Sequence, residues 1–295
     1  MRIELLTPAG WPDYELIDSG NSRKLERYGK YVLDRPEPEA IWRPRLASDK
    51  WAHADATFKL GEDGSEGWVE HSAIGERWQM RHDQLRFWAQ LTPFRHTGVF
   101  PEQSVNWRWI ARQVEKARRP VRVLDLFGYT GIASLAAAAA GASVTYLDAS
   151  KQAMAWARDN QVESGLQDRP VRWILDDALK FVRREARRGT RYDAIIMDPP
   201  VFGRGAKGEI WRFPTGFPQL IDACREVLTD DPLFVLVNAY AINFSSVMLG
   251  NVLAELMAAH RGTLTVGELA LAESGNGRLL STGIFGRWAA GRGDE

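Results

Sequence analysis

The stretch VLDLFGYTGIASLAAAAAGASVTYLDAS, residues 123–150, decides which fold this chain is expected to adopt. It reads as a buried strand, a turn between Gly128 and Gly131, an alanine-rich helix, and a second strand that ends in Asp148. Folds that bind nucleotides use this layout, with an acid about 20 residues beyond the turn for a ribose hydroxyl. The turn lacks the G-x-G-x-x-G pattern of dinucleotide-binding proteins, and Asp125 precedes it, so the rest of the chain must indicate the ligand.

Composition sets the broad class of protein. A chain of 295 residues is long enough for one large domain or two smaller ones. Basic and acidic residues number 38 each, so any surface for a nucleic acid would have to be a local patch. The single cysteine, Cys224, excludes an intramolecular disulfide and favours a reducing compartment. The first residues carry acids where a signal peptide needs an apolar core, and no long apolar run follows, so we expect a soluble cytoplasmic protein.

The chain changes character near residue 90. Residues 1–90 contain short runs broken by Gly, Pro, Asp and Ser, which predicts a small β-rich N-terminal domain with substrate recognition as its candidate role. Six of the 12 tryptophans fall in this part. We expect them to fill a small core, with stacking on nucleic-acid bases as the alternative.

Residues 91–295 predict a second domain in which strands and helices alternate. An amphipathic helix is expected over 100–117, and the later helices over 131–140, 151–164, 178–187, 215–228 and 245–260. The strands are expected over 121–127, 143–148, 171–175, 192–197 and 233–239, followed by a hairpin formed by residues 263–272 and 278–289. Such alternation predicts an α/β, Rossmann-like parallel sheet with helices on both faces, here with seven strands and an antiparallel C-terminal hairpin.

Four consecutive predicted strands end in aspartate. These residues are Asp125, Asp148, the pair Asp176-Asp177 and Asp198, and the fifth strand ends in Asn238-Ala239-Tyr240. In such sheets ligands bind outside the carboxyl ends of the strands, so we expect a site there. Asp177 also fits a structural role as the cap of the next helix. Asp198 does not fit a cap, because two prolines and a glycine-rich loop follow it.

The acid beside the turn narrows the choice of ligand. Phosphate-binding turns avoid nearby carboxylates, since the helix N-terminus is the partner of the anion. Asp125 lies three residues before Gly128, and no G-x-x-x-x-G-K-[ST] motif is present. The ligand should therefore carry positive charge and hydroxyls without a pyrophosphate, and S-adenosylmethionine fits that description. A dehydrogenase is disfavoured for the same reason.

Four motifs in order resemble the class I methyltransferases. They are DLFGYTG (125–131), YLDAS (146–150), DDALKF (176–181) and DPPVFGRG (198–205), and they are most similar to the bacterial large-subunit ribosomal RNA methyltransferases, whose turn reads D-L-F-x-Y-T-G. HTGVFPEQ (96–103) resembles the segment that precedes the cofactor domain in that group and covers the cofactor. The resemblance spans about residues 90–290.

The resemblance implies a cofactor role for each motif. Asp125 and the turn 127–131 would hold the methionine end, Asp148 would accept both ribose hydroxyls, and Asp177 would accept from the adenine amino group. The full expected set for the cofactor is Phe100, Gln103, Asp125, Phe127, Gly128, Tyr129, Thr130, Gly131, Asp148, Ala149, Ser150, Asp177 and Ala178.

The same resemblance places the chemistry at Asp198, Pro199 and Pro200, facing the methyl group and the substrate. Because the cofactor carries the reactive methyl group, the protein mainly supplies alignment. Phe202 is expected to stack on a base, with packing in the core as the alternative. Arg204 and Lys207 complete the expected substrate contacts.

The substrate is less constrained than the cofactor. Cytosine-5 methylation needs a thiolate, and the related ribosomal cytosine enzymes carry it just after the fifth strand, where LVNAYAINFSS (236–246) has no cysteine. Cys224 lies in a predicted helix and is interpreted as buried packing. We therefore expect methylation of a base nitrogen in ribosomal RNA, with a protein, a small molecule or cytosine C5 as alternatives. The arginine-rich stretches 115–122 and 183–191 are interpreted as solvated faces rather than RNA sites, and the five histidines predict no metal site.

Overall fold

The computed structural model describes residues 1–60, 66–205, 208–240 and 244–291. The chain forms two compact units, which we describe separately. The first unit contains Met1–Leu6, Asn106–Leu269 and Gly283–Glu295, and the second contains Thr7–Val105 and Ala270–Thr282. This division differs from the expected domains 1–90 and 91–295, since the first strand joins the alternating part and part of the C-terminal hairpin joins the N-terminal part.

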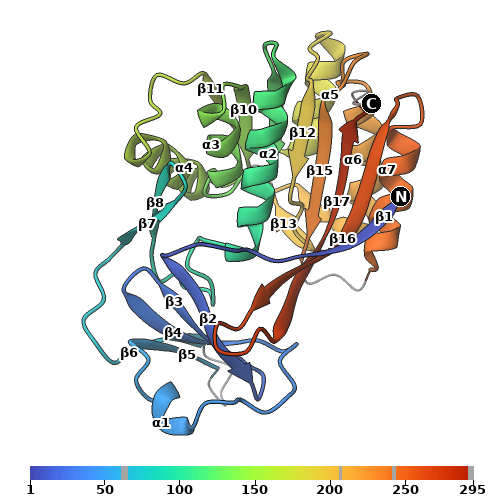
Figure 1. Ribbon diagram of the computed structural model, residues 1–295. Coiled ribbons are helices and arrows are strands. Elements are labelled where there is room, and N and C mark those ends of the chain that lie inside the picture. Colours follow the sequence, from blue (N-terminus) through green and yellow to red (C-terminus); the bar gives the residue numbers. More distant parts are fainter. Residues whose placement is uncertain (61–65, 206–207, 241–243, 292–295) are drawn as a thin grey trace. The chain divides into compact units, whose positions relative to one another are not determined.

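The first unit is built on an eight-stranded, mostly parallel sheet (Figure 1). Its strand order is β1-β16-β17-β15-β12-β9-β10-β11. The bounds are β1 Arg2–Leu6, β9 Arg122–Leu126, β10 Ser143–Asp148, β11 Val171–Leu175, β12 Ala194–Met197, β15 Phe234–Ala239, β16 Gly262–Ala272 and β17 Leu279–Ala290. β17 runs antiparallel to β15, as the expected hairpin requires. The α/β prediction is confirmed, and β1, which pairs in parallel with β16, is an additional strand.

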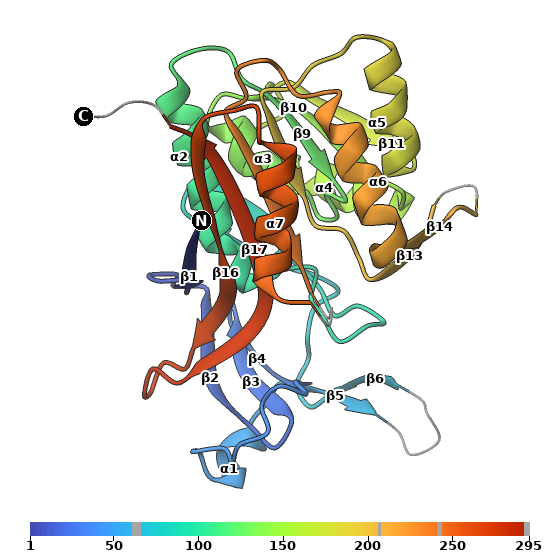
Figure 2. The ribbon, with the colours of Figure 1, turned by 90° about the vertical axis from the view of Figure 1, so that its right-hand side faces the viewer.

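Helices cover both faces of this sheet (Figure 2). α2 (Ser104–Ala117) and α3 (Ile132–Ala139) contribute to one apolar cluster, and α5 (Ala178–Arg187), α6 (Phe213–Arg225) and α7 (Ser246–Leu256) contribute to the other. α4 (Lys151–Glu163) packs against α3, β10 and β11. Side chains alternate along each strand between the two clusters: Ile196 and Leu236 belong to the first, and Met197 and Val237 to the second. No helix of the described residues is long and apolar enough to cross a membrane.

The second unit is β-rich, as expected. Its five-stranded sheet has the order β2-β3-β4-β5-β6, and a separate hairpin joins β7 to β8. The bounds are β2 Tyr14–Gly20, β3 Arg23–Tyr28, β4 Tyr31–Pro36, β5 Ala56–Leu60, β6 Glu66–Glu70, β7 Trp78–His82 and β8 Leu85–Ala89, with the short helices α1 Ser48–Trp51 and η1 Pro101–Gln103. All six tryptophans of residues 1–90 are at least partly buried, which favours core packing over base stacking. Trp11, for example, contacts the rings of Tyr14, His82 and Phe87.

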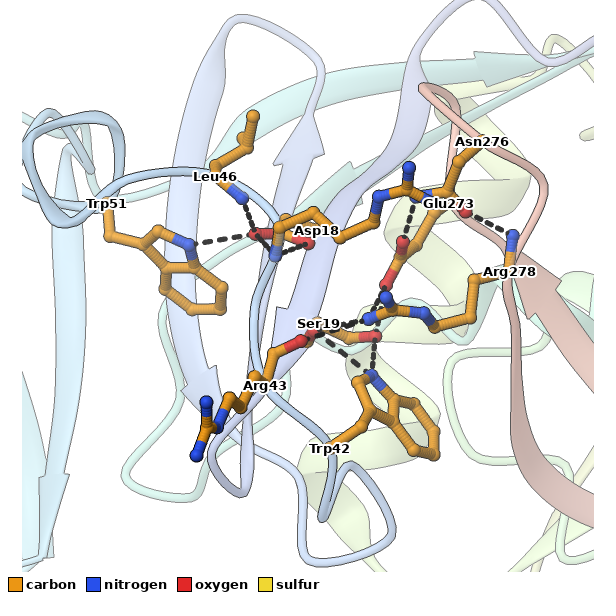
Figure 3. Close-up of polar contacts among 10 residues, drawn as sticks. Asp18, Ser19, Trp42, Arg43, Leu46, Trp51, Glu273, Asn276 and Arg278 are labelled. Carbon is orange, nitrogen blue, oxygen red and sulfur yellow. Dashed lines mark hydrogen bonds and ion pairs between the residues drawn. The ribbon is translucent and has the colours of Figure 1, made fainter.

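A buried polar network explains why residues 270–282 belong to the second unit (Figure 3). Glu273 accepts a hydrogen bond of 2.5 Å from Ser19 Oγ and forms an ion pair of 3.5 Å with Arg278. Asp18, which precedes Ser19 in β2, accepts hydrogen bonds from the backbone amides of residues 45 and 46 and from Trp51 Nε1. Since each buried acid has its partners, the network holds the connecting segments on β2.

Candidate cofactor and catalytic site

The turn between β9 and α3 has a tightly constrained backbone. Phe127, Tyr129 and Gly131 have positive φ angles of 61°, 44° and 77°. A Cβ on Gly128 would lie 2.4 Å from the Tyr146 ring, and one on Gly131 would lie 2.7 Å from the Cβ of Ala157. Both glycines are therefore required by close packing, and the two non-glycine residues accept a conformation that L-amino acids rarely adopt.

Asp125 is a buried carboxylate beside this turn. Only 2% of the residue is exposed, and Oδ2 accepts a hydrogen bond of 2.6 Å from Ser134 Oγ in α3. Burial, with a smaller contribution from the charge of Asp148, raises the pKa of Asp125 to about 7. Within the described part of the chain no lysine or arginine forms an ion pair with Asp125. A buried carboxylate of this kind fits a ligand that brings its own positive charge.

Asp148 lies at the end of β10 and binds the turn through its backbone. Its Oδ2 accepts from the Tyr129 amide at 3.0 Å and its Oδ1 from the Ser150 amide at 2.8 Å. Burial raises the pKa of Asp148. The Ala149 amide also donates to this carboxylate, and because a carboxylate has about four acceptor positions, it retains capacity for a hydroxyl group. Ser150 caps α4, since its Oγ accepts from the Ala153 amide.

Asp177, which follows β11, caps the N-terminus of α5 as expected. Its Oδ1 accepts from the Lys180 amide at 2.9 Å, at the N-terminus of α5, where Ala178 is the first residue. Asp176 forms an ion pair of 2.6 Å with Arg184 and accepts from the Asp177 amide. Capping uses only Oδ1 of Asp177, so contact with an adenine amino group through Oδ2 stays a prediction.

Asp198 follows β12, the strand next to β9. Its amide donates to the Leu126 carbonyl at 3.4 Å, so the chain is still held against β9 where β12 ends. Pro199 is buried, and the Pro200 carbonyl accepts from Trp211 Nε1 at 2.6 Å. The acid is thus followed by a rigid segment whose position is fixed by a side chain of the next hairpin.

That hairpin joins β13 (Phe202–Arg204) to β14 (Ile210–Arg212). Phe202 is 50% exposed, and the Arg212 guanidinium lies 5.7 Å from its ring centre. Core packing is therefore wrong as the explanation of Phe202, and the exposed ring remains a candidate for base stacking. Lys207 lies outside the described residues.

Two predicted cofactor residues, Phe100 and Gln103, belong to the second unit. The Gln103 amide donates to the Phe100 carbonyl at 3.0 Å, and Gln103 is buried at the end of η1. Arg35 Nη1 donates to the carbonyl of Arg95 at 2.8 Å, which fixes the start of this segment. Their role toward a cofactor stays a prediction.

Sequence reasoning missed two contributors to the site. Ser134 bonds Asp125, and its signal is that it is the only polar side chain in the helix IASLAAAA. Asn160 donates from Nδ2 to the Thr130 carbonyl at 2.8 Å and so holds the turn from α4. A buried asparagine on a helix face has no local pattern that points to a turn 30 residues away.

Each arginine-rich stretch contains an ion-paired side chain. Arg188 pairs with Glu185 within 183–191, and Arg119 pairs with Asp193 from the 115–122 stretch. Among the residues that the structure describes, no three His, Cys, Asp or Glu side chains are close enough together to hold a metal ion.

Comparison with solved structures identifies the same architecture in other proteins. A SAM-dependent methyltransferase from Agrobacterium tumefaciens is 47% identical with a TM-score of 0.94, over 98% of this chain and 94% of that chain. A Streptococcus mutans protein described as a SAM-dependent methyltransferase is 15% identical with a TM-score of 0.72, over 95% of this chain and 76% of that chain, and shares the fold.

Two proteins of similar sequence are named as ribosomal RNA methyltransferases. The ribosomal RNA large subunit methyltransferase K/L of Chromohalobacter salexigens is 33% identical over 145 residues, which are 49% of this chain and 19% of that protein. The ribosomal RNA large subunit methyltransferase K of Neisseria meningitidis is 25% identical over 248 residues, covering 81% of this chain and 68% of that protein. The chain thus spans about a fifth of the length of the K/L protein.

Three features of the site fit S-adenosylmethionine. The buried Asp125, which has no cationic partner among the described residues, fits the ammonium group. The glycine turn fits the backbone of the methionine part, and the Asp148 carboxylate fits the ribose. A family model described as S-adenosylmethionine-dependent methyltransferase matches residues 32–231. Both observations confirm the cofactor and the enzyme class expected from the motifs, and the chain belongs to the S-adenosylmethionine-dependent methyltransferases.

Proposed function

We propose that this methyltransferase transfers the methyl group to a base nitrogen of ribosomal RNA. The observation that carries the proposal is Asp198, held beside β9 by its amide and followed by two prolines. An acceptor fixed in this way can orient the N–H of a planar base before the methyl group arrives. Relatives named as ribosomal RNA methyltransferases support RNA as the substrate, and an RNA of the ribosome would place the enzyme in the cytoplasm.

In this proposal S-adenosylmethionine supplies the activated methyl group, and the chain supplies position. Asp125, the turn 127–131 and Asp148 hold the cofactor, and Asp177 completes its surroundings. Asp198, Pro199 and Pro200 then present acceptor oxygens to the nucleophile, while Phe202, Arg204 and Lys207 contact the base and its phosphates. The role of Phe202 is supported by its exposure and by the cation of Arg212 beside it.

A nitrogen target is favoured over cytosine C5 by the only cysteine. Cys224 is fully buried in α6 among apolar side chains, and burial raises the pKa of its thiol well above the usual range. A neutral, enclosed thiol is a poor nucleophile.

The test is kinetic. Single-turnover methylation would be measured with total RNA from a strain that lacks the enzyme, for the wild type, Asp198→Ala and Asp198→Asn. We expect Asp198→Ala to lower the rate by about 100-fold or more with nearly unchanged cofactor affinity, because the interaction belongs to the transition state. Asp198→Asn keeps an acceptor oxygen and should retain partial activity if hydrogen bonding is sufficient.

Mapping of methylated nucleotides in the same RNA identifies the target. Wild-type rates in Asp198→Ala would contradict the role of the Asp-Pro-Pro segment. Methylation of a protein or small-molecule fraction without any RNA product would contradict the proposed substrate.

A further inference from the structure

A chain of three buried polar side chains leads to the carboxyl end of β15. Arg287 in β17 donates from Nε to Asn106 Oδ1 at 2.9 Å, and also from Nη2. Asn106, in the first turn of α2, donates from Nδ2 to Asn238 Oδ1 at 2.8 Å. All three residues are at least 92% buried.

This chain fixes the orientation of both amide groups. Arginine has only donors, so the atom of Asn106 that faces Arg287 must be its oxygen, and its nitrogen must then face Asn238. The atom of Asn238 that accepts from Asn106 must be its oxygen, which leaves Asn238 Nδ2 as the outer end of the chain. Burial lowers the pKa of Arg287 to about 9, so the guanidinium still carries its proton at neutral pH and the order of donors holds.

The outer end forms no hydrogen bond to the described residues. Asn238 is 3% exposed, and the bond that its Oδ1 accepts from Asn106 is the hydrogen bond that its amide group makes with them. Buried amides are normally paired, so a donor left open by such an ordered chain is available to a partner from outside the protein.

The location of Asn238 indicates which partner. Met197 of β12 and Val237 of β15 are register partners on parallel strands, so Asp198 and Asn238 follow as the next pair. Asn238 falls on the sheet face that carries Leu236, which is the face of Asp125 and α2, and Asp198 is the residue that follows the neighbouring strand β12. An open donor therefore stands one strand away from the acceptor proposed to orient the nucleophile.

We infer that Asn238 is a substrate-binding residue whose amide donates to an acceptor oxygen or ring nitrogen of the substrate base, and that Asn106 and Arg287 are its positioning residues. This inference rests on the proposed function, because the base is its ligand. Together Asp198 and Asn238 would present one acceptor and one donor to neighbouring atoms of a planar edge, which selects bases by their hydrogen-bond pattern.

The kinetic test uses Asn238→Asp, which keeps the shape and the oxygen that Asn106 requires but replaces the open donor with an acceptor. We expect the single-turnover methylation rate to fall about 10- to 100-fold, because one buried hydrogen bond to the base is lost. The affinity for the cofactor should stay within about twofold of the wild type. Asn251→Asp, an exposed asparagine in α7, adds the same charge elsewhere and should leave the rate unchanged. Asn106→Ala should raise KM more than it lowers kcat, since Asn238 keeps its amide but loses its orientation.

A binding test separates failure of this inference from failure of the proposed function. The Nδ2 proton signals of Asn238, assigned by their loss in Asn238→Asp, would be followed by NMR with S-adenosylhomocysteine bound while each of the four ribonucleoside monophosphates is added. A shift with at least one nucleotide supports the inference even if ribosomal RNA is not methylated. Unchanged signals with every nucleotide, or wild-type methylation by Asn238→Asp, would overturn it.

Discussion

Glu26 of the second unit and the strand-end acids Asp125 and Asp148 of the first unit are buried carboxylates in opposite surroundings. In the second unit Glu26 has no exposed surface, and Arg35 donates two hydrogen bonds to it, of 2.9 and 2.6 Å. Burial alone would raise the pKa of Glu26, but the charges of Arg35 and Lys24 outweigh burial and the pKa lies below its ordinary value. In the first unit Asp125 and Asp148 have no such cation, and burial raises the pKa of both.

The difference separates a structural acid from a binding acid. Glu26 also accepts from the hydroxyl of Tyr14 at 2.7 Å, so its partners all come from the protein and fix neighbouring strands. Asp125 has one hydroxyl partner, and its remaining capacity is available to a cationic ligand. The raised pKa of Asp125 fits the cofactor role expected for it, and the lowered pKa of Glu26 fits a structural role.

The largest effect is expected from breaking the complete network. Arg35→Met removes the cation and leaves Glu26 as a buried charge, which should destabilise the second unit by about 3–5 kcal/mol. Arg27→Met is the matched control, because the Arg27–Glu15 pair is about one-third exposed and should cost at most about 1 kcal/mol. Hydrogen exchange of the β3 and β4 amides measures the stability of the second unit in both variants. Equal losses of stability would show that the buried pair contributes no more than the exposed one.

A smaller effect, on binding rather than stability, is expected at Asp148. Asp148→Ala removes a charged acceptor of the ribose hydroxyls and should weaken S-adenosylmethionine binding by about 1.5–3 kcal/mol in calorimetry. Asp231→Ala, at a carboxylate whose side chain is 91% exposed, should leave the affinity unchanged. Wild-type affinity in Asp148→Ala would remove this residue from the cofactor site.

Asp125 should make cofactor binding depend on pH. Its pKa of about 7 exceeds the ordinary value of about 3.9, so between pH 4 and 7 the folded state holds a proton that the unfolded state has released. Stability from this group therefore falls as pH rises through that window and is constant above about pH 7. A cationic ligand favours the ionised form, so cofactor affinity should rise from about pH 5.5 to 7.5, with proton release on binding at pH 6.

Calorimetry at pH 6 in two buffers of different ionisation enthalpy measures that proton. The heat should differ between buffers for the wild type and not for Asp125→Asn, which cannot release a proton. Proton release that persists in the variant would assign it to another group.

Local patterns made the first unit largely predictable. β10, β11 and α5 have the expected bounds, because apolar strands, an acid cap at Asp177 and a helical period all act within a few residues. β1 was missed because its residues are mostly exposed and its partner strand β16 lies about 260 residues away in the chain. The place of residues 270–282 was missed for the same reason, since Glu273 and Ser19 meet only in the fold.

The parts of the site that depend on a single local segment of the sequence were predictable. The positions of Asp125, Asp148 and the glycine turn at the strand ends followed from spacing, because a strand, a turn and a helix fix their geometry locally, and their contacts with the cofactor stay a prediction. The Arg287–Asn106–Asn238 chain was not found, since it joins three elements and its meaning depends on which donors are already used. Motifs indicate first contacts with the cofactor, and only the fold shows which polar groups remain open.

The smallest effect on activity is expected from substitution of Cys224, a buried group among apolar side chains. Cys224 is buried in α6 with no exposed surface, far along the helix from its N-terminus at Phe213. Because no base or cation lowers the pKa of its thiol, the thiol should take no part in methyl transfer. Cys224→Ala should therefore keep wild-type single-turnover rates while losing about 1 kcal/mol of stability to the small cavity. Loss of methylation in a folded variant that binds the cofactor normally would revive a thiolate mechanism and a cytosine target.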